Sequence, residues 1–488
     1  MAARRRGGDG GPAAGAATLP HVLQRTPPRL SELSTVDPRL LGRGSAFFGH
    51  TREVNVRDHG AVGDGYADDT AALQAAIDAC AAAGGGRVVV PGPRTYRLGT
   101  IYLRSNVELH LEETAVLQAS LDRAHYAEAA LIAADGARNV TVSGGGRIDG
   151  RSHDFMTAWN DPSGLGPWIY TPASWRPKIF ELRACTGVTV RDITFGDAPH
   201  WGLHLWGCEH VLVDHLTVAN DLQVPNCDGV DIDRSRDVEV RGCVLRTGDD
   251  SVVVKASANP AGRDFGVTRG VHVHDCELTT QDSALKIGTE TTADVLDVLF
   301  ERCVVRSSNR ACSIMLRDAG DVRNVVFRDI LFESRLFSDP WWGHGEAVSV
   351  TAFPRADGGA IGVVSGIRLE RLTGTSENSL RVDGSAQSRP RDITLRDVHL
   401  TLTKWTTFPG GVYDNRPTTV RPALQPHDTP GFHLSAADDV LVRDCSVAWG
   451  PNPPDYYSNA LVAEDVTGLR LEGFRGQAAH PGGVAVRT

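Results

Sequence analysis

The chain repeats a short unit in which apolar and polar residues alternate, a polar corner follows, and a second short apolar run closes the unit. Alternation with a period of two is typical of β-strands, because successive side chains point to opposite faces. The units recur roughly every 22 to 35 residues with few helical stretches between them, which favours a solenoid over a sandwich or propeller. We therefore predict an all-β, single-stranded, right-handed parallel β-helix. The clearest copies are 211–216, 238–244, 271–278, 298–304, 325–330, 367–372, 393–398 and 440–447.

This repeat runs without a linker from residue 52 to residue 488, which predicts one elongated domain rather than several. Residues 1–51 form an N-terminal extension, and its first part, rich in Ala, Gly, Arg and Pro, is expected to be disordered. Its arginine run 4–6 is followed by glycines instead of an apolar segment, which is a poor export signal. We expect a cytoplasmic protein with no membrane partner, or a secreted one if the true start lies elsewhere.

A single amphipathic helix is expected near the start of the domain. Asp68–Thr70 is a typical helix start, and the glycines at 84–86 are a typical helix end. A helix here would cover the apolar core at the first turn of the solenoid and prevent end-to-end strand pairing. The apolar positions at helical spacing are Leu73, Ala76, Ile77 and Cys80.

Charge and cysteine usage exclude several kinds of partner. The net charge is -10 and no basic stripe is present, which argues against nucleic acid. Nine cysteines without CxxC pairs or His-rich spacing indicate neither a disulfide framework nor a metal site, and we expect no cofactor. Four cysteines occupy the same place in their repeats and predict an inward-facing stack of small side chains. They are Cys243, Cys276, Cys303 and Cys445.

Carboxylates gather at the heads of two successive repeats, in the segments Asn226–Asp231 and Gly248–Ser251. Stacked turns lie about 4.8 Å apart, so residues about 22 positions apart in the sequence become neighbours in space. Like charges held this close raise the pKa of at least one carboxyl group, as general acid catalysis of glycoside hydrolysis requires. Asp-Gly and Gly-Asp pairs are also ordinary turn chemistry, but two of them heading consecutive β-branched strands favour a catalytic cluster. The candidate catalytic residues are Asp228, Asp249 and Asp250.

These motifs resemble glycoside hydrolase family 28, the polygalacturonase-like family of the pectin lyase-like superfamily, over nearly the whole chain after residue 52. The Asn-x-Asp-Gly and Gly-Asp-Asp motifs are the most specific match, and segments 58–70, 176–177 and 199–204 are similar to family segments as well. The resemblance implies that Asp249 protonates the glycosidic oxygen while Asp228 and Asp250 activate water. It also implies inversion at the anomeric centre without a covalent intermediate.

The residues around the carboxylates depart from the family pattern. The family's Gly-His-Gly segment corresponds to Asp282–Ala284, and its Arg-x-Lys to Met315–Arg317, which argues against unmodified homogalacturonan as the substrate. Adjacent tryptophans in a long loop indicate either a sugar-stacking platform or side chains that only cover the sheet. Lys255 ends a strand and is interpreted as structural. The predicted substrate-binding residues are Asn226, His204, Ser283, Lys286, Glu290, Arg317, Trp341 and Trp342.

We therefore predict a monomeric, inverting glycosidase that acts on pectin-related poly- or oligosaccharides, of the galacturonan or rhamnogalacturonan-like kind. One alternative is a β-helix lyase or epimerase, which would need a basic side chain and often calcium. The other alternative is a non-catalytic carbohydrate-binding β-helix, in which changing Asp249 would have no effect.

Overall fold

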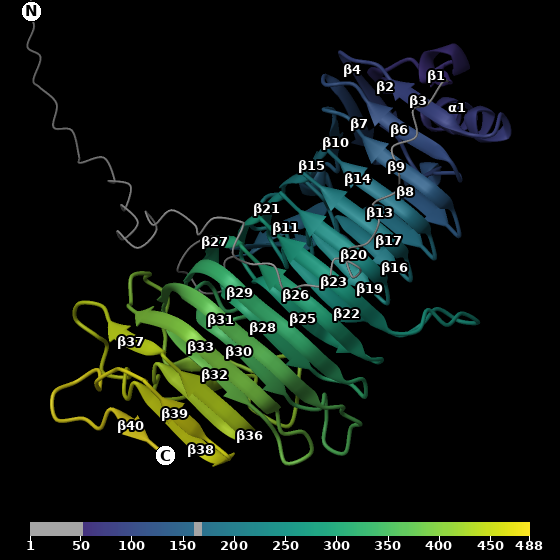
Figure 1. The fold of residues 1–488 in the computed structure, drawn as a ribbon. Coiled ribbons are helices and arrows are strands. Elements are labelled where there is room, and N and C mark those ends of the chain that lie inside the picture. The colour runs from purple at the N-terminus through teal and green to yellow at the C-terminus, as the bar shows by residue number, and fades with distance from the viewer. Residues whose placement is uncertain (1–51, 161–167) are drawn as a thin grey trace, which may run out of the picture. The chain divides into compact units, whose positions relative to one another are not determined.

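The computed structural model describes residues 52–160 and 168–488, and the predicted extension 1–51 lies outside this range. The described residues form a parallel β-helix, in which each strand pairs with the equivalent strand one turn before and one turn after it (Figure 1). The predicted fold of stacked parallel strands is thus confirmed. Three parallel ladders run along the solenoid.

The first ladder carries the candidate site. It consists of β5 (Ile101–Tyr102), β8 (Ala130–Asp135), β13 (Lys178–Arg183), β16 (Leu203–Trp206), β19 (Val230–Asp233), β22 (Val252–Ala256), β25 (Ser283–Thr291), β28 (Arg310–Leu316), β30 (Glu346–Ala352), β32 (Asn378–Asp383), β36 (Phe432–Arg443), β38 (Leu461–Thr467) and β40 (Val486–Arg487).

The second ladder begins at the first turn. It consists of β1 (Glu53–Asn55), β3 (Gly86–Val90), β6 (Val107–Leu111), β9 (Arg138–Ser143), β14 (Thr186–Arg191), β17 (Glu209–Asp214), β20 (Arg236–Arg241), β23 (Thr268–His274), β26 (Val295–Glu301), β29 (Val322–Ser334), β31 (Val364–Ser376), β33 (Arg391–Leu402), part of β36, and β39 (Arg470–Glu472).

The third ladder closes each turn, and the long strands β29, β31 and β33 bend from the second ladder into it. Its other members are β2 (Asp64–Asp68), β4 (Arg94–Leu98), β7 (Ala115–Ala119), β10 (Arg147–Asp149), β15 (Thr194–Gly196), β18 (Thr217–Ala219), β21 (Val244–Thr247), β24 (Glu277–Thr280), β27 (Val304–Ser308) and β37 (Ser446–Trp449).

Two antiparallel hairpins project from the stack: β11 (Met156–Asn160) with β12 (Ile169–Pro172), and β34 (Val412–Asp414) with β35 (Leu424–Pro426). Short 3-10 turns occupy Val56–His59, Arg123–His125 and Ser152–Phe155. Among the described residues, no helix has the length and apolar character needed to cross a membrane.

The capping helix is α1 (Thr70–Ala82), which lies beside the first strands at the N-terminal end of the solenoid (Figure 1). Its buried face is the predicted set of Leu73, Ala76, Ile77 and Cys80. Asp68 accepts a hydrogen bond from the Thr70 backbone N–H at 3.1 Å, whereas the Asp69 carboxylate accepts from the backbone N–H groups of Val62 and Gly63. The helix therefore forms as predicted, but Asp69 ties the preceding loop instead of capping the helix with its side chain.

Inward-pointing residues of the three ladders form one continuous apolar core. Within it, Phe300 and Phe327 stack on successive turns with ring centroids 4.9 Å apart. The predicted cysteine positions all face this core, and the Cys276 thiol interacts with the thiols of Cys243 and Cys303 on the turns either side. Repetition of one residue type at one position thus produces a ladder of like side chains.

This burial predicts that the thiols are chemically inert in the folded protein. All nine cysteines are free and buried, and burial raises the pKa of several, Cys227 and Cys312 among them, which suppresses the reactive thiolate. We expect a thiol reagent such as Ellman's reagent to label none of them in buffer and all nine in guanidinium chloride. Rapid labelling of a thiol in the native protein would contradict this placement.

Candidate active site

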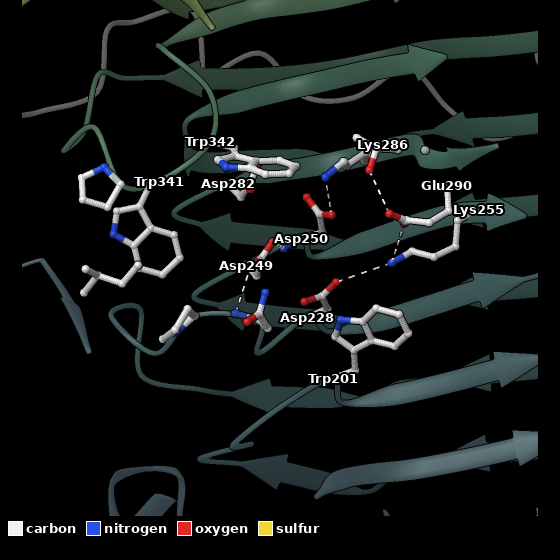
Figure 2. A pocket seen from close by; sticks show the side chains of 16 residues that line it. Trp201, Asp228, Asp249, Asp250, Lys255, Asp282, Lys286, Glu290, Trp341 and Trp342 are labelled. Carbon is white, nitrogen blue, oxygen red and sulfur yellow. Dashed lines mark hydrogen bonds and ion pairs between the residues drawn. The ribbon is translucent and has the colours of Figure 1, made fainter. Parts of the chain in front are cut away.

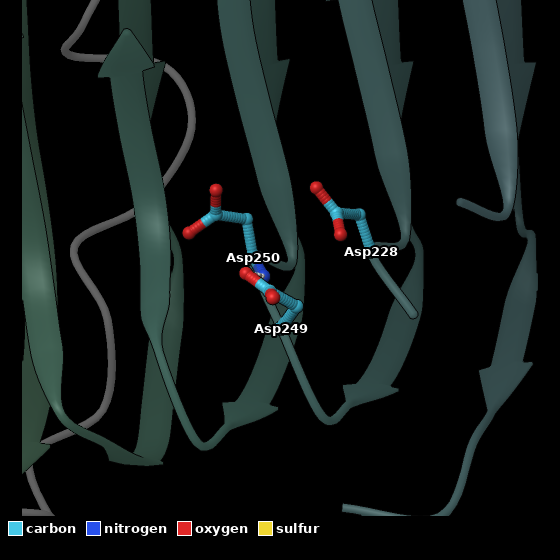
Figure 3. A group of neighbouring side chains, drawn as sticks. All are labelled: Asp228, Asp249 and Asp250. Carbon is cyan, nitrogen blue, oxygen red and sulfur yellow. Dashed lines mark hydrogen bonds between the residues drawn. The ribbon is translucent and has the colours of Figure 1, made fainter. Parts of the chain in front are cut away.

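The three candidate catalytic carboxylates lie at the start of two neighbouring strands of the first ladder. Asp228 lies just before β19, and Asp249 and Asp250 lie just before β22 (Figure 3). The turns are in register there, since the Gly229 backbone N–H donates to the Asp250 carbonyl oxygen at 2.9 Å. The sequence spacing therefore brings Asp228 and Asp250 to equivalent positions on adjacent turns.

Glycines in both motifs permit this close stacking. A Cβ atom at Gly229 would lie 2.4 Å from the Ser251 carbonyl oxygen, and one at Gly248 would lie 2.3 Å from the Val224 carbonyl oxygen. Any larger residue would separate the turns. The glycines of the Asp-Gly and Gly-Asp pairs thus serve close approach of the backbone and so position the carboxylates beside them.

Each of the three carboxylates offers an oxygen within 4.8 Å of the others. Asp228 is buried, and burial together with the charges of Asp231 and Asp249 raises its pKa well above the usual value. Burial raises the pKa of Asp250 to about 6. Lys286 opposes this rise, and the charge of Asp249 adds to it. The cluster therefore retains a proton near neutral pH, as predicted for general acid chemistry.

Asp249 is the most open member of the cluster. It is partly exposed, whereas Asp228 and Asp250 are both buried. Its two oxygens accept hydrogen bonds from backbone N–H groups, one from Asn226 at 3.1 Å and one from Asp250 at 3.0 Å. These bonds fix the orientation of the carboxyl group at the cleft side of the cluster.

Two buried lysines balance part of this negative charge. The Lys286 ammonium donates to Asp250 at 2.7 Å. The Lys255 ammonium lies 2.9 Å from Asp231, 3.7 Å from Glu290 and 4.0 Å from Asp228. Although burial lowers the pKa of each lysine, the surrounding carboxylates together raise it above the usual value, so both lysines stay charged.

These groups line a pocket of about 270 Å³ (Figure 2). Aromatic side chains border it, with Trp342 on one side of the carboxylates and Trp201 on the other in this view. Its charged lining residues are Asp228, Asp249, Asp250, Asp282, Glu290, Lys255 and Lys286.

Five predicted substrate-binding residues line this pocket, namely Asn226, Lys286, Glu290, Trp341 and Trp342. The two tryptophans differ in their surroundings. Trp341 is 3% exposed and its indole Nε1–H donates to the Trp168 carbonyl oxygen at 2.6 Å. Trp342 is partly exposed. Trp342 is therefore the better surface for a sugar, and Trp341 chiefly holds the loop in place.

Three predicted substrate-binding residues do not line the pocket, namely His204, Ser283 and Arg317. His204 is buried behind Trp201, with its ring nitrogens near Lys178 and Asp233. Ser283 is buried and donates to Asp282 through its hydroxyl group at 3.1 Å, and its backbone N–H donates to Asp250 at 3.3 Å.

Arg317 is 1% exposed, and its guanidinium donates to the backbone carbonyl oxygens of Leu316 and Thr351. Burial and the nearby arginines Arg310 and Arg381 lower its pKa to about 9. Arg317 is thus occupied by the protein itself and holds the covering segments against the sheet.

Lys255, Asp282 and Trp201 line the pocket although sequence reasoning set Lys255 aside and did not single out the other two. Strand alternation carried a signal for Lys255: Val252 and Val254 face the core, so Lys255 faces outward with the catalytic groups. The Lys255 ammonium lies 4.0 Å from the centre of the Trp201 ring, a cation–π contact that fixes both side chains.

The carboxylate cluster also has the oxygen ligands that a hard cation prefers. However, Lys255 and Lys286 already set two ammonium groups against these carboxylates. The chain itself thus supplies the positive charge that a metal would bring. The carboxylate cluster can therefore hold a proton and provide an ionised base at the same time. The tryptophans that line the pocket provide an aromatic surface for a ring-shaped ligand.

Comparison with known proteins decides the family. Residues 80–409 match the model of the family described as glycosyl hydrolases family 28. The chain belongs to this family. The predicted glycosidase class is thereby confirmed, and a poly- or oligosaccharide substrate follows from it.

Two relatives of this family-28 glycosidase align over about three quarters of their own length. A protein named Probable polygalacturonase from Arabidopsis thaliana is 24% identical over 370 residues, covering 72% of this chain and 75% of that protein. A protein also named Probable polygalacturonase, from Vitis vinifera, is 26% identical over 385 residues, covering 73% of this chain and 76% of that protein. The crystal structure of an exopolygalacturonase from Thermotoga maritima aligns with a TM-score of 0.63 and 23% identity, over 72% of this chain and 87% of that one. This likeness confirms the right-handed parallel β-helix.

Proposed function

We propose that this family-28 glycosidase hydrolyses glycosidic bonds in pectin-related saccharides by single displacement with water and inversion at the anomeric carbon. The observation that carries the proposal is the cluster of Asp228, Asp249 and Asp250, whose oxygens lie within 4.8 Å of one another at the pocket. The pectin-related substrate rests on the polygalacturonase names of the relatives.

Roles follow from burial and hydrogen bonding. Asp249 is the member open to the pocket, so it delivers the proton of the cluster to the leaving oxygen. Asp250 is ionised above its pKa of about 6 and accepts the proton of the attacking water, whereas Asp228, whose pKa is raised well above the usual value, holds the proton that the cluster shares. Lys286 stabilises the ionised form of Asp250 through the 2.7 Å hydrogen bond.

The lyase or epimerase alternative needs a neutral base to take a proton from a sugar carbon. Lys255 and Lys286 are the basic side chains among the described lining residues. Surrounding carboxylates raise the pKa of both lysines above the usual value, which keeps them protonated and unable to act as bases. The charge environment thus favours hydrolysis over elimination.

The test is to incubate the purified protein with pectic polymers and oligosaccharides and to follow products by mass spectrometry and proton NMR. We expect saturated products that have gained one water, with the inverted anomer appearing first. Unsaturated products would establish the lyase instead, and the retained anomer would overturn single displacement.

The pH profile gives a further prediction. Because Asp250 must be ionised to act as base and its pKa is about 6, kcat/KM should fall about tenfold per pH unit below pH 6. Lys286 lowers the pKa of Asp250, so Lys286→Met should move this acid limb to higher pH. Arg263→Met, which breaks an exposed pair with Asp135, is the control and should leave the limb unchanged. An acid limb near the ordinary aspartate value of 3.8 would contradict the assignment.

A further inference from the structure

We infer that the sugar unit bound beside the three carboxylates carries no free carboxylate: it is a neutral sugar or a uronate whose acid group is esterified. This inference rests on the proposed function and specifies its substrate class. It follows from the charges that face the pocket, from the partners of the two lysines, and from the neutral residues on the next turn.

Carboxyl groups outnumber ammonium groups at the pocket surface. Five carboxyl groups and two ammonium groups line it among the described residues. Burial raises the pKa of Asp282 well above the usual value. Lys286 opposes this rise, and the neighbouring carboxylates add to it. Asp282 is therefore held neutral, and the remaining carboxylates already match the two ammonium groups before any ligand enters.

Neither lysine is free to bind an incoming acid. Lys286 is 4% exposed and is held by Asp250 at 2.7 Å. Lys255 is 3% exposed, and its ammonium is shared among Asp231, Glu290 and Asp228 while it rests on the Trp201 ring. A ligand carboxylate would have to displace an existing partner and leave that partner buried and unpaired.

Among the described residues, the next turn supplies no exposed cation in place of the lysines. In the strand register, Lys286 pairs with Ser313, and Gly288 pairs with Met315. The positions on β28 next to the site therefore carry neutral side chains. At the rim, Arg355 makes two hydrogen bonds to Asp318 and lies 4.0 Å from Glu290. Arg310 and Arg317 on this turn, and Arg381 on β32, are all buried.

The aromatic border suits a ligand without charge. Trp342 is partly exposed at the pocket and offers an indole face to the apolar side of a sugar ring. Stacking of this kind needs no ion pair. A free acid group would instead add negative charge to a pocket that the carboxylates of Asp250 and Glu290 also line, and juxtaposed like charges disfavour binding strongly.

The experiment compares matched ligands on the full-length protein. Its first pair is an oligogalacturonide as the free acid and as the fully methyl-esterified form of the same length. Its second pair is rhamnogalacturonan oligosaccharides that end in rhamnose or in galacturonate. In each pair, the member whose end unit carries no free carboxylate is called the uncharged member, and we expect kcat/KM to be at least 100-fold higher for this member in at least one pair. Equal or faster turnover of the free acids would overturn the inference while leaving the proposed function intact.

Binding separates the inference from the reaction. The same ligands are titrated into the Asp249→Asn variant by calorimetry, where we expect the uncharged members to bind more tightly. Tighter binding of these ligands without any turnover by the natural protein would support the inference and reject the proposed hydrolysis. Failure to bind or cleave any member of either pair would reject both.

A charge variant tests the cause. Glu290 lines the pocket with 39% of its side chain exposed, so Glu290→Gln should reduce the preference for uncharged ligands by about fivefold to tenfold. Glu277→Gln is the matched control, because Glu277 lies on β24 outside the pocket lining and pairs with Arg306 at the surface. An unchanged preference in Glu290→Gln, or an equal change in both variants, would show that pocket charge is not the cause.

Discussion

Asp249→Asn is expected to lower kcat by at least about 10³-fold, because an amide cannot protonate the leaving oxygen of a glycosidic bond. The substitution keeps the shape of the side chain, and its oxygen can still accept a backbone hydrogen bond of the kind now made by Asn226 or Asp250. The variant should therefore fold and bind oligosaccharides. The measurement is the initial rate of product formation at the pH optimum of the natural protein.

Folding of the variant is checked by denaturant unfolding, where the midpoint should change little. Asp392→Asn, at an exposed site paired with Arg368, is the control and should retain full activity. If Asp249→Asn kept more than a tenth of kcat, the proton would have to come from another member of the cluster. Asp228 would then be the donor, because its raised pKa keeps its carboxyl group protonated as well.

Much of this site could be predicted because a β-helix converts sequence spacing directly into distance. Asp228 and Asp250 occupy equivalent positions of adjacent turns, and their motifs contain the glycines that allow the turns to stack closely. Strand alternation and repeated positions indicated the core, and helical spacing with its start and stop residues indicated α1. Each of these predictions depends on local pattern and on contacts between neighbouring turns.

The remaining features depend on contacts that no spacing rule provides. Arg317 is held partly by the segment around Asn415, whose carbonyl oxygen lies 3.5 Å from its guanidinium although 98 residues separate them. Trp341 is fixed by Trp168, 173 residues away in sequence. Lys255 looked structural because a lysine at a strand end is ordinary, and only the position of Asp231 one turn earlier reveals its ion pair. Loops that fold over the sheet therefore decide which outward residues meet the pocket.

Lys255→Met is expected to lower the free energy of unfolding by about 3 to 5 kcal/mol, because it leaves buried carboxylates without their cation. Asp231 is completely buried and lies 2.9 Å from the lysine ammonium, and Asp228 and Glu290 lie within 4.0 Å. Methionine preserves the length and apolar character of the stem, so the loss reports charge and not a cavity. The measurement is the shift of the guanidinium chloride midpoint at constant slope.

Two further variants separate burial from simple loss of an ion pair. Arg263→Met breaks the 2.7 Å pair with Asp135 at the surface and should cost less than about 1 kcal/mol. The double variant Lys255→Met/Asp231→Asn should recover part of the stability lost by Lys255→Met, because the buried charge that needed the lysine is then absent. Equal losses for Lys255→Met and Arg263→Met would mean that water reaches the cluster freely. The low-dielectric surroundings that raise the carboxyl pKa values at this site would then be excluded as well.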